Sequence, residues 1–191
     1  ITLLGAVLGR CREVTMAYPG GCVIGQRPID IHLSALRKMG VTIYEKEGCF
    51  TARVKSLEGA VINLPISSVG ATENVILAAV MARGVTVLQN AAKEPEIATL
   101  CEFLREAGAV IEGIGGSVLI IQGGHELHGV SFRVPADRIV AGTYLMSVIG
   151  AGGNIFLEDA PASQMRGMLK IADEIGAQIH ISREGLHVIA D

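Results

Sequence analysis

Three glycines stand at equal intervals in this sequence, and each occupies the same place in a similar stretch. Gly40, Gly108 and Gly176 are separated by 68 residues each. A fixed interval of this size indicates a chain built from copies of one supersecondary unit. The three stretches are IDIHLSALRKMGVTIYEKEGCFTARV from Ile29, IATLCEFLREAGAVIEGIGGSVLIIQ from Ile97 and MRGMLKIADEIGAQIHISREGLHVIA from Met165.

Each copy predicts a helix, a strand, a turn and a second strand. Before the glycine, apolar residues recur at helical spacing, as Ile29, Leu33 and Leu36 do in the first copy. The glycine itself suits the left-handed position at which a helix ends. After it, two β-rich runs flank a turn that contains glycine, which is the pattern of a hairpin.

A further helix and strand precede each of these stretches. Segments that begin at Ile1, Glu73 and Gly142 each read as an apolar helix, a glycine break and a strand. Residues 75–82 are apolar on every side, which predicts a buried helix. We also expect closing strands at residues 60–64 and 130–134. Buried helices with sheets outside them would form an inside-out arrangement about a pseudo-threefold axis, although the same periodicity fits an ordinary two-layer α/β sandwich.

Composition limits the classes of function. The 191 residues are 50% hydrophobic, enough for one large or two modest cores. The net charge of -3 argues against nucleic acid as a partner. Apolar runs are shorter than the roughly 20 residues of a membrane span, so we expect a soluble, cytoplasmic protein with no membrane partner. The chain starts inside an apolar segment, and we expect it to be a piece of a longer protein.

The four cysteines form no CxxC pair and no metal-ligand spacing with the histidines, so we expect reduced thiols, no metal and no cofactor. Cys22 stands among Gly20, Gly21 and Gly25. Those glycines predict an exposed loop, and the nearby Arg27 is a cation of the kind that favours thiol reactivity. The alternative is a turn that happens to contain cysteine. Cys101, in contrast, is expected on the buried side of its helix.

Two short segments lead into predicted helices. Residues 27–31 (RPIDI) place Pro28 and Asp30 at a helix start, and residues 67–73 (SSVGATE) place hydroxyl groups there. Both patterns fit ordinary helix capping, and both also fit an anion held by free amide groups. The second segment lacks the spacing and the lysine of a Walker motif. We interpret residues 93–96 (KEPE) as a purely structural helix start.

Taken together, four motifs resemble one family of enzymes. PGGCVIGQRPIDIHL, SSVGATENVILAA, NAAKEPEI and PADRIVAGTY occur in the same order in the UDP-N-acetylglucosamine enolpyruvyl transferases, or 1-carboxyvinyltransferases, and the resemblance covers the whole chain. It implies an inside-out α/β barrel fold of the EPSP synthase type, built from repeated βαβαββ units. It also implies transfer of the enolpyruvyl group of phosphoenolpyruvate to the 3-hydroxyl of UDP-N-acetylglucosamine, the first committed step of peptidoglycan synthesis.

The resemblance also assigns roles to residues. Cys22 matches the family's cysteine that acts as a general acid toward phosphoenolpyruvate. The resemblance also implies that fosfomycin-type epoxides attack the thiol of this cysteine. Ile66 replaces a lysine that some members of the family carry. The residues that match nucleotide-sugar contacts are Arg27, Pro28, Ile29, Asp30, Ile31, Ser68, Val69 and Gly70.

A domain boundary is implied near the PADR motif. Residues 1–135 would belong to the domain with the cysteine loop and residues 136–191 to a second barrel domain. The family's proton-accepting aspartate lies outside this chain, so we expect the chain alone to be inactive. Two alternatives remain at this point: a 5-enolpyruvylshikimate-3-phosphate synthase, which lacks the cysteine loop, and a non-catalytic nucleotide-sugar-binding paralogue.

Overall fold

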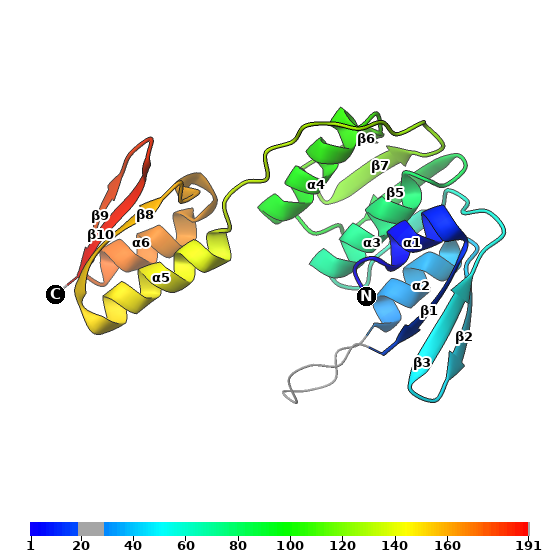
Figure 1. Cartoon of the computed structure of the whole chain (residues 1–191), viewed down its shortest axis with the longest axis horizontal. Helices are drawn as coiled ribbons and strands as arrows, with labels where there is room; N and C mark the ends of the chain where they lie inside the picture. Colours follow the sequence, from blue (N-terminus) through cyan, green and yellow to red (C-terminus); the bar gives the residue numbers. More distant parts are fainter. Residues whose placement is uncertain (19–28, 191) are drawn as a thin grey trace. The chain divides into compact units, whose positions relative to one another are not determined.

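The computed structural model describes residues 1–18 and 29–190, which divide into two compact units (Figure 1). The first unit comprises Ile1–Phe132 and the second Arg133–Asp191.

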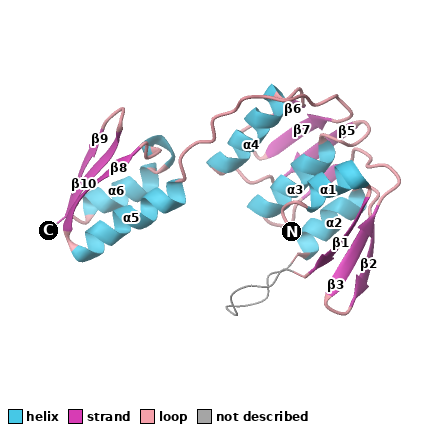
Figure 2. Ribbon diagram, in the orientation of Figure 1, coloured by secondary structure: helices cyan, strands magenta, loops and turns pink. Residues whose placement is uncertain are grey.

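The first unit contains two copies of the repeat, as predicted (Figure 2). Its helices are α1 (Leu4–Cys11), α2 (Asp30–Lys38), α3 (Val69–Ala79) and α4 (Pro95–Glu106). Its strands are β1 (Glu13–Ala17), β2 (Thr42–Lys46), β3 (Cys49–Arg53), β4 (Val61–Asn63), β5 (Val85–Gln89), β6 (Val110–Glu112) and β7 (Val118–Gln122).

Two sheets cover the helices of this unit on different sides (Figure 1). The first sheet has the order β1-β3-β2 and is antiparallel. The second has the order β4-β5-β7-β6, and within it β4 runs parallel to β5. The closing strand of the first copy therefore joins the sheet of the second copy, which links the two repeats.

The core of the first unit lies between the helices and the inner faces of both sheets. Helix α3 is buried along most of its length, which confirms the prediction for residues 75–82. Phe50 of β3 and Ile121 of β7 are both fully buried on the sheet faces that meet the helices. Helices inside and sheets outside are the inside-out arrangement, not the two-layer sandwich.

The second unit contains one copy of the repeat. Helices α5 (Arg138–Ala151) and α6 (Arg166–Glu174) pack on a sheet of order β8-β10-β9, with a short 3-10 helix η1 (Ala162–Gln164) between β8 and α6. The strands are β8 (Gly153–Glu158), β9 (Gln178–Ile181) and β10 (Gly185–Ala190).

The repeated glycines have the conformation that the sequence predicts. Gly40, Gly108 and Gly176 follow α2, α4 and α6 with φ values of 90°, 106° and 100°. This left-handed region is accessible to glycine without a steric penalty, so these residues end the helices sharply. The break after α1 differs, because Arg12 and not a glycine takes the left-handed position, at φ 67°.

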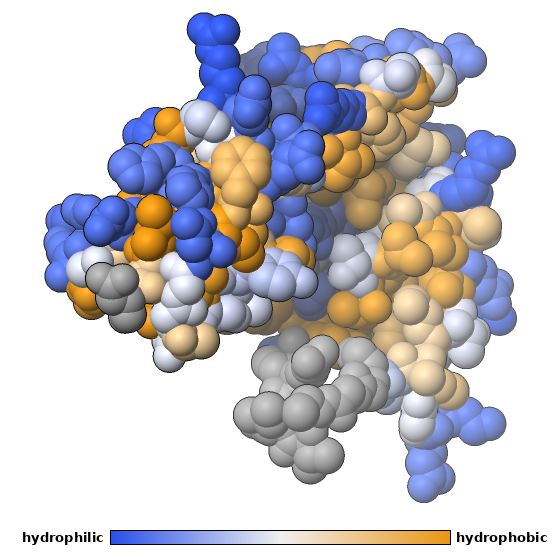
Figure 3. All heavy atoms as spheres, turned by 60° about the vertical axis from the view of Figure 1, so that its left-hand side comes forward, coloured by the Kyte–Doolittle hydropathy of each residue, from blue (hydrophilic) through white to orange (hydrophobic). Residues whose placement is uncertain are grey.

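One expectation from the sequence is wrong, and one apolar helix is less buried than its composition suggests. Residues 130–134 form no strand, and Arg133 instead bonds Asp159 through an exposed ion pair of 3.0 Å. Helix α5 is buried only at Ala141, Gly142 and Leu145, although its sequence is as apolar as that of α3. Because the second unit holds a single repeat, no neighbouring helix pair within that unit covers the rest of α5. Figure 3 shows hydrophobic residues, coloured orange, on the surface of the molecule.

Candidate functional site

The cysteine segment falls on residues that the structure does not describe. Cys22, Arg27 and Pro28 lie in the range 19–28, outside the described residues. Their roles remain predictions.

The residues on both sides of this range are held in place by the first unit. The Tyr18 hydroxyl donates a hydrogen bond of 2.7 Å to the Glu45 carboxylate, which also accepts one from Arg37. The Tyr18 ring lies 5.6 Å from that of Phe50. On the other side, Ile29 is buried in the core at 8% exposure. The structure thus anchors the chain where it enters and leaves the range that carries Cys22.

The described residues of the first predicted segment start α2. Ile29 occupies the position before the helix, Asp30 is its exposed first residue and Ile31 is half-buried against the core. An acidic side chain in the first turn complements the positive end of the helix dipole. Among the described residues, no side chain caps the first amide groups of α2 by a hydrogen bond, so only the charge of Asp30 supports the predicted helix start.

The second predicted segment starts α3. Ser68 takes the cap position, and its hydroxyl accepts a hydrogen bond of 3.3 Å from the Ala71 amide, as predicted. Val69 and Gly70 form the first turn. Thr72, which was also predicted to cap this helix, instead accepts a hydrogen bond of 3.0 Å from the Ala92 amide. Thr72 thereby ties α3 to the chain that leads into α4.

The structure brings these two segments together. His32, the third residue of α2, lies against Gly70: a Cβ atom at Gly70 would be 3.1 Å from His32 Cε1. Asn74 of α3 bonds the same ring, with 2.8 Å between Asn74 Nδ2 and His32 Nδ1. No sequence pattern signals this pair, because the two residues stand 42 positions apart.

A surface cavity of about 510 Å³ adjoins the second segment. It is lined by Ser67 before α3, by Asn90 and Ser117, and by Lys93 and Glu94 before α4. Lys93 is the cation of this cavity, while the neighbouring Ile66 is 59% exposed and carries no charge. The arrangement suits an anionic or polar group beside the start of α3.

Two titratable groups at this end of the unit have displaced pKa values. Burial lowers the pKa of the His32 imidazole, which favours its neutral form. Burial also raises the pKa of the Glu73 carboxyl, and the nearby Glu96 carboxylate raises it further. Both shifts come mainly from loss of contact with water.

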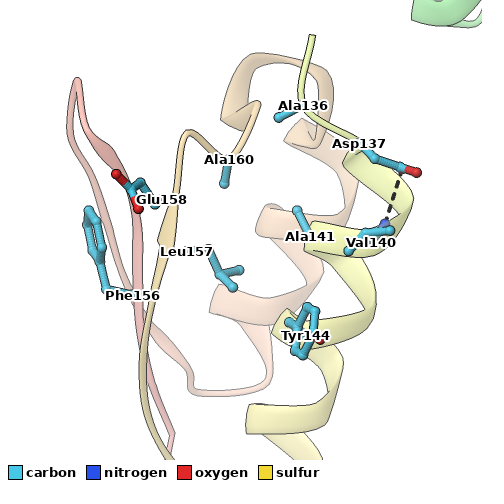
Figure 4. Close-up of a pocket in the computed structure, with 9 residues that line it drawn as sticks. All are labelled: Ala136, Asp137, Val140, Ala141, Tyr144, Phe156, Leu157, Glu158 and Ala160. Atoms are coloured by element: carbon cyan, nitrogen blue, oxygen red, sulfur yellow. Dashed lines mark hydrogen bonds between the residues drawn. The ribbon is translucent and has the colours of Figure 1, made fainter. Parts of the chain in front are cut away.

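In the second unit, a pocket of about 330 Å³ lies between α5 and β8 (Figure 4). Asp137 of the PADR motif lines its rim, and its carboxylate caps α5 by accepting hydrogen bonds from the Ile139 and Val140 amides at 2.7 and 3.2 Å. The walls are largely apolar, with Leu157 and Tyr144 among them. This motif therefore has a structural role, and no predicted site residue lies in the pocket.

Neither a membrane span nor a metal centre is found in the described part of the chain. Among residues 1–18 and 29–190, none of the helices combines the length and the apolar character that a bilayer span requires. Within the same ranges, His, Cys, Asp and Glu side chains nowhere gather in a group of three or more able to hold a metal ion.

Sequence comparisons agree with these features. The sequence model of the EPSP synthase (3-phosphoshikimate 1-carboxyvinyltransferase) family matches residues 1–189. A UDP-N-acetylglucosamine 1-carboxyvinyltransferase of Zymomonas mobilis is 46% identical over 193 residues, which cover 100% of this chain and 45% of that protein. A protein of the same name from Oleidesulfovibrio alaskensis is 42% identical over 184 residues, covering 96% of this chain and 44% of the relative. The chain thus spans less than half the length of these curated relatives.

Solved structures show the same fold at lower identity. The enolpyruvyl transferase NikO from Streptomyces tendae superposes with a TM-score of 0.81 at 20% identity, covering 98% of this chain and 46% of that one. An EPSP synthase from Acinetobacter baumannii gives a TM-score of 0.69 at 22% identity, covering 99% of this chain and 45% of that one. These likenesses confirm the predicted EPSP synthase-like α/β fold, and the barrel is not closed within these 191 residues.

Proposed function

The chain belongs to the EPSP synthase (3-phosphoshikimate 1-carboxyvinyltransferase) family, and from that premise we propose that the protein of which it is part is a UDP-N-acetylglucosamine enolpyruvyl transferase. It transfers the enolpyruvyl group of phosphoenolpyruvate to the 3-hydroxyl of UDP-N-acetylglucosamine and releases phosphate. One observation carries the choice of acceptor: a relative with that name matches the whole chain at 46% identity.

Cys22 is the proposed general acid. Its thiol gives a proton to the methylene carbon of phosphoenolpyruvate, which makes the adjacent carbon electrophilic. The 3-hydroxyl oxygen of the sugar then attacks that carbon, while the hydroxyl proton passes to the proton-accepting aspartate of the family. The resulting tetrahedral adduct loses phosphate together with one proton of its new methyl group, which restores the carbon–carbon double bond. A loop that closes over the substrates would exclude water from the activated intermediate.

The proposed nucleotide-sugar site combines the two helix starts. Arg27 offers a charge-assisted hydrogen bond to a phosphate oxygen, together with Pro28, Ile29, Asp30 and Ile31. Ser68, Val69 and Gly70 supply the second part, at the amino end of α3. The contact between His32 and Gly70 supports a single site, because it places α2 and α3 side by side there.

We propose a cytoplasmic enzyme that catalyses the first committed step of peptidoglycan synthesis, with roles in cell shape and division, and that needs neither metal nor cofactor. Residues 1–135 belong to the cysteine-loop domain and residues 136–191 to the second barrel domain, a boundary that the division into compact units supports. We propose that the 191-residue chain alone is inactive, because it spans less than half the length of its curated relatives.

The test is phosphate release from phosphoenolpyruvate by the full-length protein, with UDP-N-acetylglucosamine or shikimate 3-phosphate as acceptor, for wild type and Cys22→Ser. Phosphate release that requires the nucleotide sugar and is lost in Cys22→Ser supports both the proposed transferase activity and the role of Cys22 as the general acid. Release with shikimate 3-phosphate would instead identify the shikimate-pathway enzyme. A folded protein that binds UDP-N-acetylglucosamine without releasing phosphate would be a binding paralogue.

A further inference from the structure

The outer face of the sheet in the second unit carries two neighbouring histidines. Helices α5 and α6 lie against the other face, where Leu186 and Val188 of β10 are fully buried (Figure 1). Because side chains alternate along a strand, His187 between them belongs to the outer face. His187 pairs directly with His180 of β9, and the centroids of the two rings lie 6.0 Å apart. Two imidazoles therefore stand side by side on this face.

A third side chain holds one of these rings. Asn154 lies on β8, at the other side of β10, and its Oδ1 is 2.6 Å from Nε2 of His187. An amide oxygen only accepts hydrogen bonds, so Nε2 is the donor and carries the ring proton. The lone pair of the neutral His187 ring is then on Nδ1. That nitrogen is the one that can bind a cation.

Metal-ligating histidines in proteins have this arrangement. Such a histidine binds the ion through one ring nitrogen and donates the N–H of the other to an oxygen, which fixes the tautomer and the orientation of the ring. The bond from His187 to Asn154 supplies that outer contact before any ion is bound. Nitrogen–metal bonds of about 2 Å allow two rings at this separation to share one ion. His180 is exposed, so its ring is free to turn toward the ion.

The position of the pair determines which kind of ion it suits. His180 and Asn154 are exposed and His187 is half-buried, so solvent reaches the rings. Imidazole nitrogen suits Zn²⁺, Ni²⁺ and Cu²⁺, whereas Mg²⁺ and Ca²⁺ require oxygen ligands. Two side chains are fewer than a closed protein site provides, so water fills the remaining coordination positions. Because the sheets lie outside the helices in this fold, further repeats cover the helices and not this face.

We propose that His180 and His187 form a two-histidine site for a divalent transition metal ion, with Asn154 as the residue that positions His187. None of the residues proposed to bind the substrates belongs to this site, and the proposed reaction does not require the ion. The inference does not depend on the proposed function, because it rests on the three side chains alone.

The site is tested by calorimetric titration of the wild-type full-length protein with Ni²⁺. Either His180→Asn or His187→Asn leaves one imidazole, and the loss of a ligand should exceed the loss of an outer contact. Each variant should therefore weaken Ni²⁺ binding by more than roughly tenfold, with an unchanged melting temperature. His125→Asn, at an exposed position of the first unit, is the matched control and should bind Ni²⁺ as wild type does. Titration with Mg²⁺ should give no difference between these proteins.

A spectroscopic measurement locates the ion. Ni²⁺ is paramagnetic, so a substoichiometric amount should broaden the ring signals of His180 and His187 together in the NMR spectrum, before those of His125 and His128. Broadening of only one ring of the pair would overturn the shared site. Ni²⁺ binding that is unchanged in both His180→Asn and His187→Asn would overturn it as well.

The positioning role of Asn154 has its own test. Asn154→Ala removes the acceptor of the Nε2–H group and leaves both imidazoles, so the Kd for Ni²⁺ is expected to rise roughly tenfold. Asn154→Asp keeps an oxygen acceptor at this position and should bind Ni²⁺ at least as tightly as wild type. Unchanged binding in Asn154→Ala, or equal weakening in both variants, would overturn the positioning role and leave the two-histidine site in place.

Discussion

His32 and Cys101 are both buried in the first unit, and burial moves their pKa values in opposite directions. It lowers the pKa of the His32 imidazole and raises the pKa of the Cys101 thiol to about 11. In each case the charged form is the one that loses contact with water, so both groups are held neutral at pH 7. The same cause gives one residue a pH-dependent effect on stability and makes the other chemically inert.

His32 should make the first unit less stable in mild acid. Its folded-state pKa lies below the unfolded value of 6.5, so the unfolded chain binds the proton first. The stability that the neutral imidazole contributes is present above pH 6.5 and is lost as the pH falls from there toward the folded pKa. We expect the urea midpoint of wild type to fall between pH 7 and pH 5 more steeply than that of His32→Asn. Equal slopes in the two proteins would contradict this, with His125→Asn as the control.

The cysteines should differ in reactivity. Cys101 is fully buried with a raised pKa, whereas Cys11 is exposed. Because the thiolate is the reactive form, iodoacetamide at pH 8 should label Cys11 at least tenfold faster than Cys101 in the native protein. Peptide mass spectrometry measures the rates, and the difference should vanish in denaturant. Comparable native rates would show that the helix α4 core opens readily.

An epoxide of the fosfomycin type should single out Cys22. The proposed acid requires a thiol that reaches the substrate site, whereas Cys49 is half-buried in β3 and Cys101 is enclosed. We expect a mass increase confined to the peptide that contains Cys22 in the full-length protein, with protection by added phosphoenolpyruvate. Labelling spread evenly over Cys11, Cys22, Cys49 and Cys101 would remove the special status of Cys22.

At the residue scale, features set by residues close in the sequence could be predicted, whereas contacts between residues far apart in the sequence could not. The cap at Ser68 follows from the residues just after it, and the burial of Cys101 follows from the periodicity of its own helix. His32, by contrast, bonds Asn74 of another helix, and no pattern within one helix specifies such a contact.

Close approach of backbones sets the packing of α1 on α3. A Cβ atom at Gly5 would lie 2.1 Å from the Asn74 carbonyl oxygen, and one at Gly9 would lie 2.9 Å from Met81 Cγ. The first contact is with backbone, which cannot rotate away, whereas the second is with a flexible side chain. Gly5 therefore allows the short distance across which its amide reaches the Asn74 side chain.

Gly5→Ala should accordingly destabilise the first unit by about 1–3 kcal/mol, the usual range for overpacking, through separation of α1 from α3. Urea denaturation followed by circular dichroism measures the change. Gly150→Ala is the control, because it lies exposed in α5 with nothing within 4 Å of its new Cβ and should be neutral or slightly stabilising. A Gly5→Ala protein as stable as wild type would show that the helices adjust freely.

At the element scale, periodicity identified the helices and hairpins of all three copies, because each is a local pattern. Pairing between copies was harder to predict. The strand at β4 was expected, but its parallel partner β5 belongs to the next copy. Residues 130–134 have a similar pattern and form no strand. A strand requires a partner as well as a pattern, and the sequence of one segment does not contain the partner.

Across the whole chain, the two units differ in how completely they bury their apolar helices. The first unit has two repeats, and α3 lies beneath the helices and sheets of both. The second unit has one repeat and a small core of eight buried residues. On α5, Ile139 is 56% exposed and Tyr144 is 54% exposed. The pseudo-threefold design explains the difference, since an apolar helix of this fold is covered only when neighbouring repeats surround it.

The two units should therefore behave differently when produced as separate polypeptides. Residues 133–191 lie near the lower size limit for a stable domain and leave much of α5 uncovered, so this piece should be unfolded or should bind the dye ANS strongly. Residues 1–132, with the larger core, should melt cooperatively and bind far less dye. Joining residues 133–191 to the remainder of the full-length protein should abolish the ANS signal, because other repeats would then cover α5. A second unit that melts cooperatively on its own, without ANS binding, would show that one repeat suffices and that the exposed face of α5 needs no cover.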